Sequence, residues 1–486
     1  MKIKFLPLLV SGLFATSLFF SSCLNDDDEE IVLPAESSIT SFSIGTVNME
    51  KVTKDSLGKD STYIDTVSCA HYPFTIDQLK RTIENKDSLP VGSDVSRIQV
   101  QIEADSRAIV YERRGKNGEL KDTIWTPTDS IDFTHPVAFK VFALNGMTGK
   151  SYTVKVNVHK QIPDTLEWSH FETPKFASAK LSKQKTVFTN DKLVTVGVKE
   201  DGNTVAEMFS VQNAKTSVWK LIATLPENTN TYSLQTWNDE LFFVADGKMY
   251  KFGTLNNPSF QQVGSLSNLQ TLVGLGNIAA SQEVMFAYTT EKRIVALNMD
   301  GSLVQEDSFD FIDNQPFESN RLTAASIITK HNKSLTRTIV MENSIQPNDS
   351  IAHVFGYTTN DDKWGKITMT EPLHCPNLEN ISMIHYDNKL YAFGGGIPSQ
   401  KIKPFEHFYC SEDNGLTWKV VTRQMIFPQE DSPKHPTVRP FANYYTPNIE
   451  GSYSAVVDPN HFIWIIWESG QVTRGRINRL GFAPKW

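Results

Sequence analysis

The sequence has only four cysteines in 486 residues, and its longest apolar run, residues 5–20, lies at the N-terminus. Elsewhere no stretch has the roughly twenty consecutive apolar residues that a membrane-spanning helix needs. After residue 170, long segments with an apolar repeat of 3.6 residues are also missing, which excludes helical solenoids. The net charge is −8, so the chain lacks the basic excess that nucleic acids and anionic lipids attract. A globular, β-rich protein is therefore expected, with no nucleic-acid partner.

The cysteines limit the covalent and metal chemistry of the chain. Cys69, Cys375 and Cys410 remain when Cys23 is set apart, and three thiols cannot all form disulfides. A disulfide between Cys375 and Cys410 and two separately buried thiols both agree with the sequence. His374 stands beside Cys375, but no second pair of ligands at suitable spacing accompanies it, so no metal site is predicted. No cofactor is expected either.

The N-terminal segment has the pattern of an export signal. The basic start MKIK precedes the apolar run, which ends in small residues directly before Cys23. This segment resembles the signal of bacterial lipoproteins, in which the cysteine thiol receives a diacylglycerol, although Phe20 stands where leucine is usual. The resemblance implies a signal peptide over residues 1–22, a lipid anchor on Cys23 and an outer-membrane location. A secretory peptide with a chance cysteine is the alternative.

A block of acidic residues follows, because LNDDDEE places five carboxylates at residues 26–30. Like charges repel one another, so residues 23–36 are expected to form a disordered, solvated tether. The block resembles the acidic signal after the lipidated cysteine in surface-exposed lipoproteins of Bacteroidetes. That resemblance implies exposure on the cell surface, and a plain linker is the competing explanation.

Residues 37–160 show the period-two alternation of β-strands. Apolar residues alternate over 137–143 and again over 152–158, and Asn145-Gly146 between them supplies a hairpin turn. FTIDQLKRTIEN (74–85) has apolar residues on one helical face and predicts a short helix. Several strands at short spacing predict an Ig-like β-sandwich. VFALNGMTGKSYTVKV also resembles the closing hairpin of cadherin-like modules of bacterial surface proteins, which implies a spacer.

From residue 161 onward a polar turn, a strand, a second turn and another strand recur. Repeats of about 40–50 residues built of short strands are typical of propeller blades. Residues 161–486 are therefore expected to form a β-propeller of about six blades. The six copies are NDKLVTVGV (190–198), NDELFFVADGKMYKFG (238–253), EVMFAYTTEKRIVALN (283–298), RTIVMENS (337–344), DNKLYAFGGG (387–396) and NHFIWIIWESGQVTRG (460–475).

The fifth copy, DNKLYAFGGG, resembles the Kelch repeat, in which a glycine pair ends the second strand of a blade and Tyr and Trp follow. Gly394, Gly395, Tyr409 and Trp418 keep that order, whereas the other copies lack the glycine pair. Taken whole, the chain resembles a family of uncharacterised Bacteroides lipoproteins with an N-terminal sandwich and a C-terminal Kelch-like propeller. This resemblance implies an architecture and no activity.

The segment SEDNGLTW (411–418) fits the Asp-box pattern S-x-D-x-G-x-T-W residue for residue, as found in sialidases and other propellers. In those families the box lies in a turn between outer strands of a blade, away from the mouth where ligands bind. The resemblance implies a structural role, since an Asp carboxylate can accept hydrogen bonds from its own turn and a Trp can fill the space between strands. The residues concerned are Ser411, Asp413, Gly415, Thr417 and Trp418.

Two enzyme sites known on propellers match the sequence poorly. A sialidase surrounds the substrate carboxylate with three arginines, and its Arg-Ile-Pro motif has Gln161 here in place of the arginine. Arg474 and Arg476 share one strand face, and a single cluster cannot surround a substrate. The copper oxidases on Kelch propellers need a crosslinked cysteine and tyrosine, but Tyr409-Cys410 are sequence neighbours that strand alternation separates.

Two functions from different classes remain. The preferred one is a surface lipoprotein whose propeller is a binding or scaffold module, with glycans or peptides as ligands. The other is a glycoside hydrolase, sialidase-like or of another kind, with paired carboxylates at the propeller mouth. Tryptophans are candidate ligand contacts but are also typical core residues. The candidate contacts are Trp237, Trp364, Trp464, Trp467, Arg474 and Arg476.

Overall fold

The fold is all-β, as predicted, and it is described from a computed structural model. The described residues are 33–54, 60–115, 117–304, 309–319, 321–328, 332, 334–345, 349–368, 372–431 and 436–482. The predicted signal peptide, Cys23 and most of the predicted acidic tether lie outside the described residues. The helices among the described residues are five short 3-10 turns, η1 (Cys69–His71), η2 (Ile312–Asn314), η3 (Pro398–Gln400), η4 (Phe441–Asn443) and η5 (Asn478–Gly481). None of these has the length and apolar character that crossing a membrane requires.

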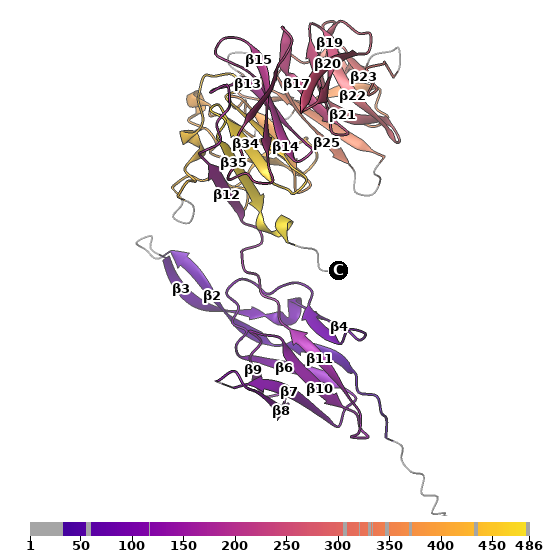
Figure 1. Ribbon diagram of the computed structural model, residues 1–486, viewed down its shortest axis with the longest axis vertical. Coiled ribbons are helices and arrows are strands. Elements are labelled where there is room, and N and C mark those ends of the chain that lie inside the picture. Colours follow the sequence, from indigo (N-terminus) through magenta and orange to yellow (C-terminus); the bar gives the residue numbers. More distant parts are fainter. Residues whose placement is uncertain are drawn as a thin grey trace, which may run out of the picture. The chain divides into compact units, whose positions relative to one another are not determined.

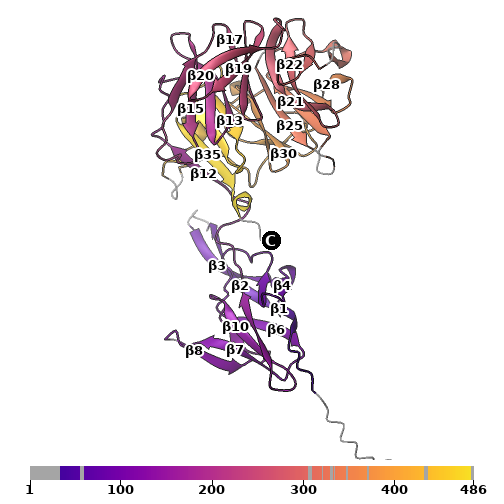
Figure 2. The same ribbon diagram turned by 45° about the vertical axis from the view of Figure 1, so that its right-hand side comes forward.

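The chain divides into two compact units between Ile162 and Pro163, and the N-terminal unit is a β-sandwich. One sheet has the order β1 (Ile39–Ile44), β6 (Ile98–Ala104) and β9 (Ser130–Ile131). The other has the order β4 (Phe74–Asp77), β5 (Thr82–Asn85), β11 (Gly149–Lys155), β10 (Val137–Phe142), β7 (Ala108–Arg114) and β8 (Leu120–Ile124). A two-stranded ribbon is formed by β2 (Thr46–Lys54) and β3 (Asp60–Ser68) (Figure 2).

Aromatic rings join the two sheets of the sandwich. Phe42 of β1 lies with its ring centroid 5.0 Å from that of Phe74 on β4 and 6.1 Å from that of Phe139 on β10. The predicted hairpin is present, with β10 and β11 paired and Gly146 of the turn at φ +72°. The two sheets therefore share one apolar core.

The helix predicted over residues 74–85 is wrong. β4 and β5 form an antiparallel hairpin in which Ile76 lies opposite Ile83. Leu79, which the helical pattern placed on the apolar face, is in the turn and is 96% exposed. The two strands happen to space their apolar residues as a helix would. Each strand contributes one isoleucine, Ile76 or Ile83, to the same edge of the core.

The C-terminal unit is a β-propeller of six sheets, as predicted. The first blade consists of β13 (Ser182–Thr189), β14 (Lys192–Val198), β15 (Thr204–Ser210) and β16 (Lys220–Thr224). The second consists of β17 (Thr229–Trp237), β18 (Glu240–Ala245), β19 (Lys248–Thr254) and β20 (Asn257–Val263). The third consists of β21 (Leu269–Ala279), β22 (Gln282–Thr289) and β23 (Ile294–Leu297). The fourth blade consists of β25 (Leu322–Ile328), β26 (Thr336–Glu342), β27 (His353–Thr358), β28 (Lys363–Ile367) and β24 (Asp310–Phe311). The fifth consists of β29 (Ser382–Tyr386), β30 (Lys389–Phe393), β31 (Tyr409–Ser411) and β32 (Lys419–Val420). The last has the order β33 (Tyr453–Val457), β34 (Ile463–Trp467), β35 (Val472–Ile477) and β12 (Leu166–Phe171).

The inner strands of the six blades form a closed ring. β13, β17, β21, β25, β29 and β33 each contact the next one, and β33 contacts β13 again. Each of the six sequence copies supplies the second strand of one blade, namely β14, β18, β22, β26, β30 and β34. The repeat in the sequence is therefore the repeat of the blades.

The first and the last strands of the propeller close the ring within one blade. β12 pairs antiparallel with β35 from Leu166 opposite Ile477 to Phe171 opposite Val472, so segments far apart in the chain lie side by side (Figure 1). Arg479 strengthens this closure. Its Nε lies 2.8 Å from Asp164 Oδ1, just before β12, and its Nη1 lies 3.0 Å from Asp387 Oδ1, in the turn after β29.

The Asp box connects β31 to β32 in the fifth blade. Asp413 Oδ1 accepts hydrogen bonds from Ser411 Oγ and from the Thr417 backbone N–H, each at 2.8 Å, and Oδ2 accepts one from Thr417 Oγ1 at 2.6 Å. Burial opposes the charge, but the bonds from Thr417 and Ser411 outweigh it and lower the pKa of Asp413. Gly415 has φ +92°, and a Cβ there would lie 3.1 Å from the Ile339 side chain.

Trp418 follows the turn and is buried in a cluster that spans two blades. The same cluster contains Ile339 and Met341 of β26 in the fourth blade and Tyr409 of the fifth. The Trp418 backbone N–H donates to the Leu373 carbonyl at 3.0 Å. The box therefore lies between outer strands, and its tryptophan packs one blade against its neighbour.

We expect Trp418→Ala to lower the free energy of unfolding by about 3–5 kcal/mol, because it removes a buried indole. Asp413→Ala should cost on the order of 1 kcal/mol, because its hydrogen bonds lie in an exposed turn. Glu412→Ala is the matched control in the same turn, since Glu412 is exposed and pairs with the Lys389 side chain at the surface. Urea unfolding measures the three values. Equal stability of Trp418→Ala and Glu412→Ala would contradict the structural role of the box.

Candidate functional site

A partly open cavity of about 300 Å³ lies on the inner side of the propeller ring. It is bordered by residues 184–187, 321–326, 381–385 and 453–457, together with Tyr232 and Gln235, so five of the six inner strands contribute. This volume is at the lower end of the range of ligand pockets, about 300–1,000 Å³. We take this axial cavity as the candidate site.

Polar side chains occur on the inner strands because those strands do not share a backbone ladder with the next blade. Lys185 Nζ donates to the Tyr232 carbonyl of the neighbouring blade at 2.7 Å. Gln235 Nε2 donates to the Val273 carbonyl at 3.1 Å. Thr186 Oγ1 lies 2.5 Å from Ser454 Oγ in the sixth blade. Side chains thus make the hydrogen bonds between blades that the backbone does not make, and they give the axis a polar lining.

The lining carries positive charge. Lys185 and Arg321 border the cavity, and no aspartate or glutamate is among its lining residues in the part of the chain that the structure describes. The Arg321 guanidinium lies 5.7 Å from the centroid of the Tyr232 ring, and its Nη1 donates to Asn343 Oδ1 at 3.3 Å. Two cations therefore share a small cavity.

Burial lowers the pKa of Lys185 to about 7, because no neighbouring charge offsets the loss of water around the ammonium. Lys185 retains some exposed surface although protein surrounds it, which is expected for a side chain that borders an internal cavity. Burial also lowers the pKa of His385, which lies on β29 of the fifth blade. In this cavity the Lys185 ammonium therefore lacks a partner of opposite charge, and the neutral form of the His385 imidazole is favoured.

Two glutamates act electrostatically on tyrosines of the lining but have partners of their own. Glu450, which influences Tyr232, lies 3.5 Å from Lys183 Nζ. Glu379, which influences Tyr453, accepts the backbone N–H of Asn448 at 2.6 Å. Neither side chain borders the cavity.

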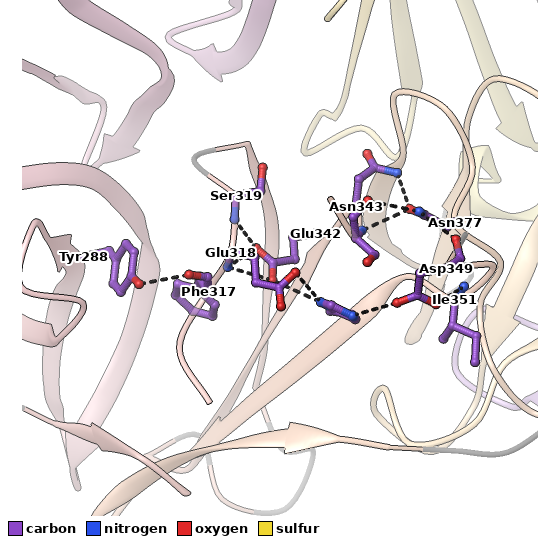
Figure 3. A network of polar contacts seen from close by, with 11 residues as sticks. Tyr288, Phe317, Glu318, Ser319, Glu342, Asn343, Asp349, Ile351 and Asn377 are labelled. Atoms are coloured by element: carbon purple, nitrogen blue, oxygen red, sulfur yellow. Dashed lines mark hydrogen bonds and ion pairs between the residues drawn. The ribbon is translucent and has the colours of Figure 1, made fainter. Parts of the chain in front are cut away.

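A second polar network lies in the fourth blade, where Figure 3 labels Glu318, Glu342 and Asp349. His353 belongs to the same network. Glu342 is fully buried, and its carboxylate accepts the backbone N–H groups of Glu318 at 3.1 Å and Ser319 at 2.9 Å. His353 Nδ1 lies 3.4 Å from Glu342 Oε1, and Nε2 lies 3.1 Å from Asp349 Oδ2. The network fixes the segment that leads into β25, so its role is structural.

The first blade repeats this arrangement with other residues. Glu207 is fully buried, and its carboxylate accepts the backbone N–H groups of Ala177 at 2.8 Å and Ser178 at 2.9 Å. That segment leads into β13, just as residues 318–319 lead into β25. A buried glutamate thus anchors the entry to an inner strand in both blades.

The four candidate tryptophans do not offer a face to a ligand. Trp237 is 6% exposed, and Trp364, Trp464 and Trp467 are 0% exposed. The indole N–H of Trp237 donates to Glu283, that of Trp464 to Asp458 and that of Trp467 to Thr473. These tryptophans are core residues, which corrects their assignment as ligand contacts, because a propeller buries its largest side chains between blades.

Arg474 and Arg476 likewise lie away from the axial cavity, on β35. The Arg474 guanidinium is 4.5 Å from the centroid of the Phe462 ring and 5.3 Å from that of Trp464. Arg476 is 4.1 Å from the Phe462 ring, and its Nη1 donates to the Asn460 carbonyl at 3.2 Å. Both arginines stack on aromatic rings of their own blade and do not line the cavity.

The cysteines and histidines do not form a redox or metal site among the described residues. Cys69, Cys375 and Cys410 are free thiols, and burial raises the pKa of Cys375. No group of three or more His, Cys, Asp or Glu side chains in the described ranges is placed to hold a metal ion. The disulfide that the sequence left open is absent.

Sequence reasoning missed the residues of the axial cavity. Lys185, Tyr232, Gln235 and Arg321 belong to no motif, and they lie outside the six repeat copies. Their position in the chain could have indicated them. Each lies in or next to the first strand of a blade, which is the strand that comes before a repeat copy. Polar residues in a strand that must face the axis would have indicated them.

We expect the stability of the fourth blade to depend on pH through His353. The contact with Glu342 raises the pKa of His353 above its usual 6.5, so its contribution is fully present below pH 6.5 and is lost as the pH rises through the folded-state value. Urea unfolding of the wild type and His353→Gln at pH 5.5 and 8.5 measures this. The stability difference between the two should shrink at pH 8.5. His461→Gln, at an exposed position of the propeller, is the control. The same stability difference between the wild type and His353→Gln at both pH values would exclude the effect.

Solved structures resemble the chain only distantly. The matches include virginiamycin B lyase from Staphylococcus aureus, with 9% identity, 64% of this chain and 99% of that one covered, and a TM-score of 0.36. A Trichoderma reesei protein of Carbohydrate-Active Enzymes Family AA12 has 8% identity, coverage of 66% and 99%, and a TM-score of 0.41. The α-L-arabinofuranosidase ARB93A from Fusarium graminearum has 10% identity, coverage of 64% and 98%, and a TM-score of 0.37. We draw nothing about function from them.

Comparison with protein families is more informative. A search of curated proteins found no match. The DUF6242 N-terminal domain, a domain of unknown function, matches residues 42–156, and the DUF6242 beta propeller domain matches residues 162–485. The second match alone covers more than half of the chain. The protein therefore belongs to the DUF6242 family, in which an N-terminal domain precedes a β-propeller of unknown function.

Proposed function

We propose that the protein is an outer-membrane lipoprotein, anchored through Cys23 and exposed on the cell surface, whose propeller binds a glycan or a peptide in the axial cavity. The observation that carries the binding role is the lining of that cavity. Amides, hydroxyl groups and two cations converge there from five blades. A concave site with a few convergent polar groups is the usual form of a ligand site.

The same lining argues for binding over hydrolysis. A glycoside hydrolase needs two carboxyl groups on either side of the bond that it cleaves. The described residues that border the axial cavity include none. The network around His353 contains three carboxylates, but Glu342 is fully buried and is occupied by two backbone N–H groups. The hydrolase alternative therefore has less support.

The anchor and the tether rest on the N-terminal sequence. Each buried CH₂ group of an acyl chain contributes about 0.8 kcal/mol to membrane binding, so the two or three chains of a lipoprotein hold it firmly. The acidic residues 26–30 would keep the segment after the anchor solvated. The sandwich and the propeller would then be presented beyond the membrane surface.

We expect Cys23→Ala to release the protein from the membrane fraction, because the substitution removes the thiol that accepts the lipid. Fractionation of cells after a high-salt wash measures this. Cys410→Ala is the matched control and should stay in the membrane fraction. Retention of Cys23→Ala with the membranes would show that Cys23 is not the anchor.

We expect Ser382→Trp to abolish ligand binding, because an indole at this lining position fills much of a cavity of about 300 Å³. Ser259→Trp on the exposed outer strand β20 is the matched control and should bind as the wild type does. Glycan and peptide arrays probed with the purified full chain measure binding, and thermal melting shows that the variants are folded. A folded Ser382→Trp protein with undiminished binding would place the ligand elsewhere.

A further inference from the structure

We infer that the axial cavity takes a carboxylate-bearing sugar, with the carboxylate between Lys185 and Arg321 and the ring hydroxyls on the surrounding amides and hydroxyl groups. This inference rests on the proposed function, since it names the class of ligand for the same site. It follows from three features of the cavity: its unbalanced charge, its free hydrogen-bond donors and its small volume.

The charge of the cavity is unbalanced in a way that an anionic ligand would correct. Lys185 and Arg321 border it, and neither has an aspartate or glutamate within ion-pair distance among the described residues. A charge held away from water without a partner is costly, and an opposite charge brought into the same low-dielectric space repays that cost. A carboxylate bound there would therefore interact more strongly than at the protein surface.

Both cations have hydrogen-bond donors to spare. The Lys185 ammonium has three N–H donors and uses one on the Tyr232 carbonyl. The Arg321 guanidinium has five, and its recorded bonds go to Asn343 Oδ1 at 3.3 Å and to the Ile381 carbonyl at 3.5 Å. The remaining donors suit the two oxygens of a carboxylate, which accept charge-assisted hydrogen bonds.

The rest of the lining suits hydroxyl groups. Gln184, Gln235, Thr323, Ser382 and Ser454 border the cavity. Gln184, Gln235, Thr323 and Ser454 already bond to protein groups, but an amide or hydroxyl oxygen has two lone pairs and can accept a further hydrogen bond. The volume of about 300 Å³ is small for a ligand site, so it accommodates one sugar residue or the end of a chain and not an extended oligosaccharide. A single acidic sugar residue combines the required charge, hydroxyl groups and size.

Lys185 makes the affinity depend on pH. Its pKa of about 7 means that the ammonium is present at pH 6 and largely lost at pH 8.5. Burial lowers the pKa of His385 below its usual 6.5 and raises those of Tyr232 and Tyr453, so Lys185 is the lining group expected to lose a positive charge as the pH rises through 7. Binding of a carboxylate should therefore weaken as the pH rises through 7.

Calorimetric titration of the purified full chain at pH 6 with three probes tests the inference. D-Glucuronate carries the carboxylate and the hydroxyl groups, D-glucose is the same ring without the charge, and acetate carries the charge without the ring. We expect glucuronate to bind at least tenfold more tightly than either of the others. Its affinity should fall severalfold between pH 6 and pH 8.5.

Variants at the two cations provide independent readouts. Lys185→Met and Arg321→Gln should each weaken glucuronate binding at least tenfold, and Lys185→Met should also remove the pH dependence. Lys220→Met and Arg423→Gln, at exposed positions outside the cavity, are the matched controls and should leave the affinity unchanged. Thermal melting reports folding, and if Lys185→Met does not fold, Arg321→Gln and the wild-type pH series still decide.

The outcomes separate this inference from the proposed function. Equal affinity for glucose and glucuronate would overturn the role of charge while a binding site in the cavity remained. Acetate binding as tightly as glucuronate would overturn the sugar class. Absence of binding by both sugars, together with array binding that Ser382→Trp does not affect, would overturn both proposals.

Discussion

The pairing of β12 with β35 is the interaction on which the rest of the propeller depends. A blade buries its two faces only against its neighbours, so an open ring would leave two faces and one strand edge exposed to water. The ring closes within its last blade, whose sheet contains the first strand of the domain, β12, and its last three strands, β33 to β35. Arg479 adds ion pairs to Asp164 and Asp387. This joint supports the ring in which each inner strand contacts the next.

The closed ring also explains why a polar cavity exists. Inner strands of neighbouring blades converge on the axis without a common ladder, so side chains such as Lys185 and Gln235 supply the hydrogen bonds between them. These side chains must be long and polar, and they leave space and unused donors along the axis. The constraint that holds the blades together thereby creates a lining with the chemistry of a binding site.

The periodicity of the sequence was sufficient for the architecture and insufficient for the site. Six copies of a turn-and-strand pattern predicted six blades, and the alternation around Asn145-Gly146 predicted the hairpin of the sandwich. Short segments were less reliable, since the apolar spacing over residues 74–85 fits a helix and a hairpin equally well.

The cavity could not be derived from sequence because its residues come together only when the ring closes. Ser454 Oγ lies 3.1 Å from Gln184 Oε1, although the two residues are 270 positions apart in the chain. Composition also misled the choice of contacts: Trp464 and Trp467 look like sugar platforms, yet a strand with apolar residues at every position is buried on both faces. Polar residues such as Lys185, which lack a motif, are distinguished only by their position on the ring.

The joint between β12 and β35 sets an order of events in the making of the protein. Leu166 and Ile477 pair across almost the whole length of the propeller, so the ring has a large contact order and cannot close until its last strand has been synthesised. Until then β12 has no partner, and the inner strands have no axis to surround. The connectivity of the chain thus delays closure of the ring until the segment that forms β35 is available to pair with β12.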